Sequence, residues 1–262
     1  MSFFMGTERI KTGILGLDEM LGGGFLPNSA NLMEGAPGTG KTTIAMQFIY
    51  NGIKNFGENG LIISFEEFPT QYYHDAAQFG WDLKSLEKEG KLKVVFSTPA
   101  TILNEINELG GELLALMKEF NIKRVVIDSV SHFEGLTTDI HQLREIERQI
   151  VNGFKREGTT AILIRENDTV FGNIDAMNSK VPFVVDSFIL LRYVEIDSEI
   201  QKALTIFKMR GSDHKKDIRK YKCTNNGIEV ESKFMGREGI MSGSSRLTPQ
   251  DAFVNVFGKK KA

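Results

Sequence analysis

The chain has 262 residues, of which 41% are hydrophobic and 25% charged, and its formal net charge at pH 7 is -2. Such values are typical of a folded globular protein with room for one large α/β core or two small domains. The near-neutral balance excludes a global basic field that would attract nucleic acid or anionic membranes, but it leaves a local patch open. Cys223 is the single cysteine, which excludes an internal disulfide. The start of the chain lacks the basic and apolar regions of a secretion signal, and no apolar run is long enough to span a bilayer, so we expect a cytoplasmic protein.

Strands and helices alternate through the first two thirds of the chain. Apolar runs of strand length predict strands at 31–34, 61–65, 91–97, 124–130 and 159–166. Apolar residues at three- and four-residue spacing predict helices over 44–53, 102–117 and 143–154. Parallel sheets require such alternation, because a helix must return the chain between neighbouring parallel strands.

The pattern changes after about residue 181. Two apolar runs, SFILLRYVEI and QKALTIFKMR, are separated by a short polar turn and followed by IRKYKCTNNGIEV, which predicts an antiparallel β-meander. From about residue 236 the chain is small and polar. We therefore predict one α/β domain over residues 1–235, with a mostly parallel central sheet flanked by helices and a C-terminal meander, and a polar tail over residues 236–262.

The segment GAPGTGKT fits the phosphate-binding loop G-x-x-x-x-G-K-[ST], between a predicted strand and a predicted helix. Its glycines let backbone N–H groups turn toward phosphates, and the helix presents its positive dipole end. Lys41 is expected to reach the β- and γ-phosphate oxygens, and Thr42 to bind magnesium through its hydroxyl. The residues expected to bind the nucleotide in this segment are Gly35, Ala36, Pro37, Gly38, Thr39, Gly40, Lys41, Thr42 and Thr43. A glycine-rich turn is the alternative, but the flanking elements favour ATP with Mg²⁺.

Carboxylates follow two other predicted strands. Asp128 ends the run RVVI and is expected beside the phosphate loop, where it would bind magnesium as a Walker B aspartate and contact the nucleotide site. A turn or helix cap is the alternative for this aspartate. Glu66 and Glu67 follow the run LIISF. We interpret Glu66 as the general base and as part of the magnesium set with Thr42 and Asp128, and Glu67 as a catalytic neighbour that tunes it; a solvated acidic loop is the alternative.

The sequence resembles the KaiC family of the RecA/RadA superfamily, the circadian clock ATPases and their single-domain archaeal relatives, over nearly its whole length. The resemblance rests on IKTGILGLDEMLGGG, GAPGTGKTT, SFEE, FGWDL and VIDSV. It continues through ILLRYVEI, KMRGSDH and IMSGSSRLT, which look more like the second KaiC domain than the first. It implies a RecA-like P-loop NTPase core, ATP hydrolysis, and a homo-oligomeric ring, commonly a hexamer, with ATP between neighbouring subunits.

The resemblance also implies residues that act on the next subunit. Lys208 and Arg210 map onto a pair of catalytic cations supplied in trans, which would stabilise the charge of a phosphoryl-transfer transition state. The later positions that match nucleotide-contacting residues are Lys208, Met209, Arg210, Ser212, His214, Thr224 and Asn225. The second KaiC domain has phosphorylation sites where this chain has Pro182 and Phe183, neither of which can accept phosphate. A clock role and the same autokinase activity are therefore doubtful.

The leading interpretation is a slow ring ATPase with a regulatory or signalling role, and two other functions stay open. The segments 132–141 and 167–180 follow strand ends where RecA-type proteins place channel loops, and their mixed charge permits DNA binding without indicating it, as in a RadA-paralogue accessory protein. ATP binding without significant turnover would instead make a nucleotide-sensing scaffold. Trp81 is expected to pack in the core rather than stack on a base. No residue pattern identifies a protein client.

Overall fold

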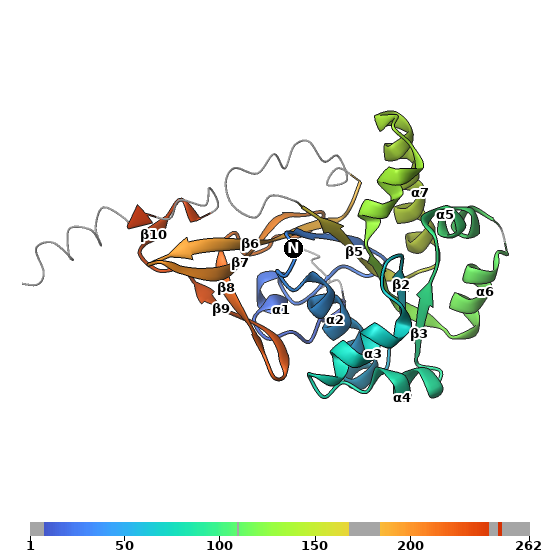
Figure 1. The fold of residues 1–262 in the computed structure, drawn as a ribbon, viewed down its shortest axis with the longest axis horizontal. Coiled ribbons are helices and arrows are strands. Elements are labelled where there is room, and N and C mark those ends of the chain that lie inside the picture. Colours follow the sequence, from blue (N-terminus) through green and yellow to red (C-terminus); the bar gives the residue numbers. More distant parts are fainter. Residues whose placement is uncertain (1–7, 109, 168–183, 241–245, 248–262) are drawn as a thin grey trace, which may run out of the picture.

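The computed structural model describes residues 8–108, 110–167, 184–240 and 246–247. Within these residues, nine strands form one sheet in the spatial order β3-β2-β4-β5-β1-β6-β7-β8-β9 (Figure 1). The strands expected from the first half of the sequence are β1 (Ala30–Gly35), β2 (Asn59–Ser64), β3 (Leu92–Phe96), β4 (Ile122–Asp128) and β5 (Thr160–Glu166). Each of their pairings with one another is parallel. The predicted α/β fold class is confirmed.

The predicted meander is also confirmed. The strand β6 (Ser187–Ile196) runs parallel to β1, and the chain then turns back through β7 (Glu199–Met209), β8 (Arg219–Thr224) and β9 (Gly227–Lys233), each antiparallel to the strand before it. Beyond the sheet, β10 (Arg237–Glu238) pairs with β11 (Arg246–Leu247). Ile240 packs against β6 and β7. The boundary at residue 235 stays a prediction.

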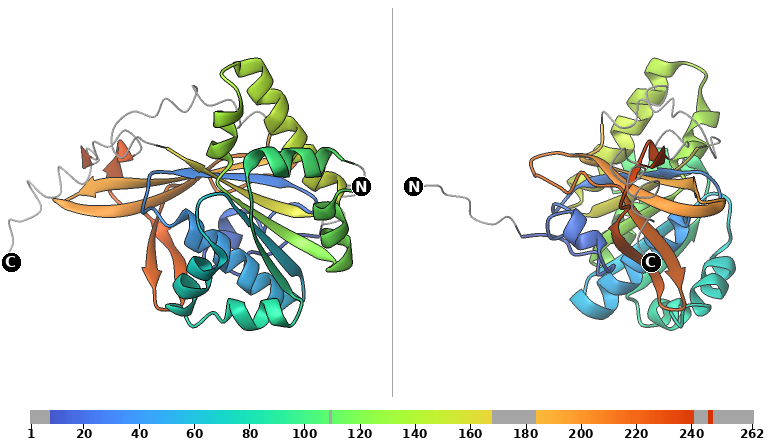
Figure 2. Two further views of the ribbon diagram at one scale, coloured as in Figure 1. Left: turned by 45° about the vertical axis from the view of Figure 1, so that its right-hand side comes forward. Right: turned by 90° about the vertical axis from the view of Figure 1, so that its left-hand side faces the viewer.

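Helices cover both faces of the sheet, as Figure 2 shows. One face carries α1 (Leu17–Met20), α2 (Lys41–Phe56), α3 (Pro69–Ala77) and α4 (Leu83–Lys88). The other carries α5 (Pro99–Asn107), α6 (Glu112–Glu119), the 3₁₀ segment η1 (Val130–Leu136) and α7 (Ile140–Arg156). Because side chains alternate along a strand, Met33 of β1 packs into the first core and Leu32 into the second. Among the described helices, none has the length and apolar character needed to cross a membrane.

The single helix predicted over 102–117 is wrong, because the structure has two helices there. The helix α5 ends at Asn107 and α6 begins at Glu112. Between them Gly110 has φ +89°, a left-handed conformation that glycine tolerates and that interrupts a helix. The apolar residues of both helices nevertheless pack into the same core. The periodicity therefore predicted correctly which side chains are buried, but it wrongly predicted one continuous helix.

Candidate functional site

The phosphate loop lies between the carboxyl end of β1 and the start of α2, and its own contacts fix its shape. The Thr39 hydroxyl donates to the Ala36 carbonyl oxygen at 2.7 Å, and the Tyr221 hydroxyl of β8 donates to the Thr39 carbonyl oxygen at 2.6 Å. Gly38 has φ +76°, and a Cβ atom there would lie 2.6 Å from the Tyr193 hydroxyl oxygen. The loop therefore needs glycine at this position, both for its backbone conformation and for space.

Lys41 lies inside the curve of this loop and is 6% exposed. Its Nζ donates to the carbonyl oxygens of Gly35 at 2.8 Å and Ala36 at 3.0 Å. Burial lowers the pKa of Lys41, and the nearby carboxylates of Glu166 and Asp128 oppose that shift. A bound phosphate would offer Lys41 charged acceptors in place of these neutral carbonyls, which makes stronger hydrogen bonds.

Thr42 and Asp128 meet at the site expected for magnesium. The Thr42 hydroxyl donates to Asp128 Oδ2 at 2.8 Å, and the Tyr72 hydroxyl donates to the same oxygen at 3.0 Å. Burial raises the pKa of Asp128, while the hydrogen bonds from Thr42 and Tyr72 and the charge of Lys41 lower it. A hydroxyl and one carboxylate are hard oxygen donors of the kind that hold Mg²⁺ together with the phosphates of a substrate, so the residues present fit this ion.

The loop opens into a cleft of about 360 Å³, to which residues of β4, β5, β7, β8 and β9 also contribute. Its lining residues are Pro37, Gly38, Gly40, Lys41, Thr42, Thr43, Asp128, Glu166, Lys202, Cys223 and Ile228. Glu166 and Lys202 were not among the residues expected here from the sequence. Glu166 ends β5 opposite Gly35, and Lys202 of β7 donates from Nζ to the Gly38 carbonyl oxygen at 2.8 Å. The signal for Glu166 was its place at a strand end, whereas no local pattern indicated Lys202.

The two glutamates follow β2, the strand whose last residue pairs with Asp128, and neither of them lines the cleft. Ser64 at the end of β2 pairs with Asp128, so the turn that follows begins beside it. Glu67 donates its backbone N–H to Ser64 Oγ at 3.1 Å. The Glu66 side chain is 67% exposed, and its Oε2 lies 4.0 Å from His132 Nε2. Glu66 thus lies just after β2, with its carboxylate near His132 of η1.

Lys208 and Arg210 are the cations expected to act on the next subunit. They lie at the end of the strands that is opposite to the phosphate loop. Along β6, Leu191 pairs with Gly35 at the phosphate loop, whereas Ser187 pairs with Met209 at the end of β7. Lys208 Nζ donates to the Val185 carbonyl oxygen at 2.7 Å. The group placed at this end comprises Lys208, Met209, Arg210, Ser212 and His214.

Thr224 and Asn225 are separate from that group. They lie at the turn between β8 and β9, next to Cys223 and near Ile228, both of which line the cleft. The Thr224 hydroxyl donates to the Gly227 carbonyl oxygen at 3.0 Å. Of the two sets of positions that resemble nucleotide contacts, only Thr224 and Asn225 therefore lie near the phosphate loop of their own chain.

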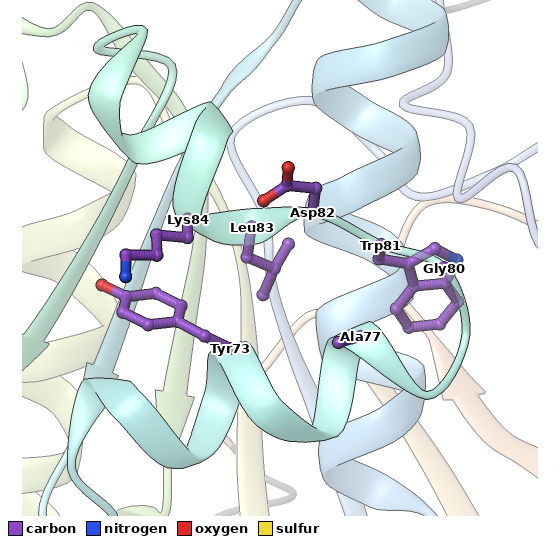
Figure 3. Close-up of a pocket in the computed structure, with 7 residues that line it drawn as sticks. All are labelled: Tyr73, Ala77, Gly80, Trp81, Asp82, Leu83 and Lys84. Carbon is purple, nitrogen blue, oxygen red and sulfur yellow. The ribbon is translucent and has the colours of Figure 1, made fainter.

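Trp81 lies in a second hollow, between α3 and α4. Figure 3 shows its lining, which is Tyr73, Ala77, Gly80, Trp81, Asp82, Leu83 and Lys84. Trp81 is 5% exposed, and its ring stacks on Phe79 and Tyr50 at centroid distances of 4.7 and 5.5 Å. The prediction that Trp81 packs in the core is confirmed.

Comparison with known proteins agrees with this geometry. The family model described as ATPase: KaiC matches residues 10–234. The chain is 34% identical over 253 residues to the circadian clock protein KaiC3 of Synechocystis sp., which covers 95% of this chain and 49% of that protein. It is 37% identical over 242 residues to the circadian clock oscillator protein KaiC of Parathermosynechococcus lividus, with 90% of this chain and 43% of that protein covered. The chain thus spans less than half the length of these relatives. A RecA-like core with a complete phosphate loop and these matches show that the chain belongs to the KaiC family of P-loop ATPases.

Proposed function

We propose that this chain binds ATP with magnesium and hydrolyses it slowly at interfaces between identical subunits of a ring, a hexamer as the resemblance to KaiC implies. The observation that carries the proposal is the separation of two groups of functional residues within one subunit. The phosphate loop and Asp128 lie at the carboxyl ends of the parallel strands, and Lys208 and Arg210 lie at the far end of β7.

The sheet itself keeps the two groups apart. Along β1, Asn31 and Gly35 are four residues apart, which corresponds to roughly 13 Å at the usual rise of a strand. Ser187 pairs with Asn31 on one side and with Met209 on the other, so Met209 lies level with the end of β1 that is remote from the loop. Lys208 and Arg210 are therefore poorly placed for their own nucleotide. A neighbouring copy could receive them, which would make hydrolysis depend on assembly.

The residues of the cleft have separate tasks in this proposal. Lys41 exchanges loop carbonyls for phosphate oxygens, and Lys202 adds a second cation from β7. Magnesium held by Thr42 and Asp128 would supply positive charge to the phosphate oxygens. Glu66 orients the attacking water after its carboxylate leaves the neighbourhood of His132. We propose slow turnover, which suits a regulatory or signalling protein.

Two earlier expectations concern residues outside the described part of the chain. Pro182 and Phe183, at the positions of the KaiC phosphorylation sites, lie outside the described residues. Residues 168–180, most of the second segment expected to form a channel loop, lie outside them too. We propose no autokinase activity at positions 182 and 183, since neither side chain has a hydroxyl. DNA binding stays an alternative that a salt-dependent gel shift with single-stranded DNA would test.

The proposal is tested by measuring phosphate release and mass by light scattering over the same range of protein concentrations, with ATP present. We expect the activity per subunit to rise as rings form, because a site shared between copies is incomplete in the monomer. Full activity per subunit in a monomeric sample would contradict the shared site. Rings that bind ATP but release no phosphate would identify a nucleotide-sensing scaffold instead.

A further inference from the structure

A buried tyrosine hydroxyl connects α3 to the Asp128 carboxylate at the end of β4. Tyr72 of α3 is 3% exposed, and its hydroxyl donates to Asp128 Oδ2 at 3.0 Å. The same carboxylate oxygen accepts the Thr42 hydroxyl at 2.8 Å. Two donors on one oxygen fix the rotation of the Asp128 carboxyl group. The position of this carboxyl group therefore depends on α3 as well as on the phosphate loop.

Ser64, at the end of β2, holds the turn that carries the two glutamates. Ser64 is 1% exposed and pairs with Asp128 across the sheet. Ser64 Oγ also accepts the backbone N–H of Glu67 at 3.1 Å. Tyr72, Asp128 and Thr42 therefore form one hydrogen-bonded set, and Ser64 ties the glutamate turn to the strand beside Asp128. Buried polar networks of this kind hold their members in one arrangement, since each unmade bond is costly away from water.

We propose that Tyr72 is a positioning residue that sets the Asp128 carboxylate for magnesium. This inference rests on the proposed ATPase function and deepens it. The Tyr72 hydroxyl acts through Asp128 rather than by touching nucleotide or metal itself. Its loss should therefore weaken both metal binding and turnover, while the phosphate loop keeps its hold on ATP.

The next residue provides a matched control. Tyr73 lies on the same helix, and its hydroxyl donates to Glu87 of α4 instead of reaching Asp128. Figure 3 shows Tyr73 beside the connection between α3 and α4, near Lys84. Tyr73→Phe removes the same atoms from the same helix without touching the Thr42 and Asp128 pair. A difference between the two variants thus reports on the contacts of Tyr72 rather than on helix packing.

The test compares full-length wild type, Tyr72→Phe and Tyr73→Phe. Electron paramagnetic resonance measures the affinity for Mn²⁺ in the presence of ADP, and steady-state kinetics separates kcat from KM for ATP. We expect Tyr72→Phe to bind Mn²⁺ roughly tenfold more weakly and to lose kcat by a similar factor, since a hydrogen bond to a charged group is worth about that much. We expect KM to stay within about twofold, and Tyr73→Phe to match wild type.

Wild-type Mn²⁺ affinity and kcat in Tyr72→Phe would overturn the inference, and so would equal losses in both tyrosine variants. If Tyr72→Phe does not fold, Tyr72→Met decides the matter, because methionine fills an apolar site without supplying a hydroxyl. A fall in kcat with wild-type thermal stability then supports the inference, and an unchanged kcat overturns it. Failure of the proposed function is distinguishable, since wild type itself would then release no phosphate from ATP.

Discussion

A methyl group at position 38 should weaken nucleotide binding for two separable reasons. Gly38→Ala places an L side chain at φ +76°, a left-handed conformation that disfavours alanine by about 1 kcal/mol. The new Cβ would also lie 2.6 Å from the Tyr193 hydroxyl oxygen, which must then leave the Pro37 carbonyl oxygen that it contacts at 3.3 Å. Shifting the Tyr193 side chain to relieve this clash adds about 1 kcal/mol.

The sum of about 2 kcal/mol corresponds to roughly thirtyfold weaker ATP binding. The effect should appear in the affinity, because a substituted loop can relax when empty and must return to its strained shape around phosphates. The contact part of the loss depends on the Tyr193 hydroxyl, whereas the backbone part does not. Removing that hydroxyl should therefore restore the contact part only.

The assay is a titration with fluorescent ATP of wild type, Gly38→Ala, Tyr193→Phe and the double variant. We expect the double variant to recover part of the lost affinity and to remain about fivefold weaker than wild type, the share left to the backbone strain. Gly57→Ala is the matched control, because Gly57 has φ +67° with no atom within 4 Å of its added Cβ. It should lower stability and leave the affinity unchanged. A double variant that binds no better than Gly38→Ala would refute the assigned contact.

Three further outcomes follow from the structure. Glu66→Gln should lower turnover at least about a hundredfold with ATP still bound, and unchanged phosphate release would remove its assignment as base. Arg124→Met should lower the free energy of unfolding in urea by about 3 kcal/mol, because Arg124 is fully buried and bonded to Glu58 at 2.6 Å; a loss below about 1 kcal/mol would contradict a large contribution. Burial raises the pKa of Glu147 from 4.5 to about 7, so the ionised form is disfavoured in the folded state and stability should fall as pH rises between these values. Glu147→Gln should remove that part of the pH dependence, and urea unfolding curves with the same pH dependence as wild type would contradict it.

Local patterns predicted the phosphate loop and its aspartate correctly as neighbours. Asp128 ends a parallel strand, and the carboxyl ends of parallel strands meet at one edge of the sheet, so its meeting with Thr42 follows from the sequence. The same reasoning applies to Glu166 at the end of β5, which lines the cleft. The break between α5 and α6 had a signal too, in the pair Gly110 and Gly111, but the apolar periodicity continued across it.

Contacts between distant parts of the chain were beyond local patterns. Lys202 reaches Gly38 only because β7 folds back along β6, and 164 positions separate the two residues. Lys208 and Arg210 alternate on a strand as residues of a solvated face commonly do, so their assignment depended on resemblance. The exposure of Glu66 depends on a side-chain orientation toward His132, which residue types and spacing do not determine.

The central claim is that one active site takes residues from two copies of this chain. The most direct test mixes subunits that carry Lys41→Ala with subunits that carry Arg210→Ala, each inactive alone. In a head-to-tail ring, random mixing restores an intact pair at about one quarter of the interfaces, so we expect about a quarter of the wild-type rate of phosphate release. A mixture that forms mixed rings by light scattering and remains as inactive as its components would contradict the shared site.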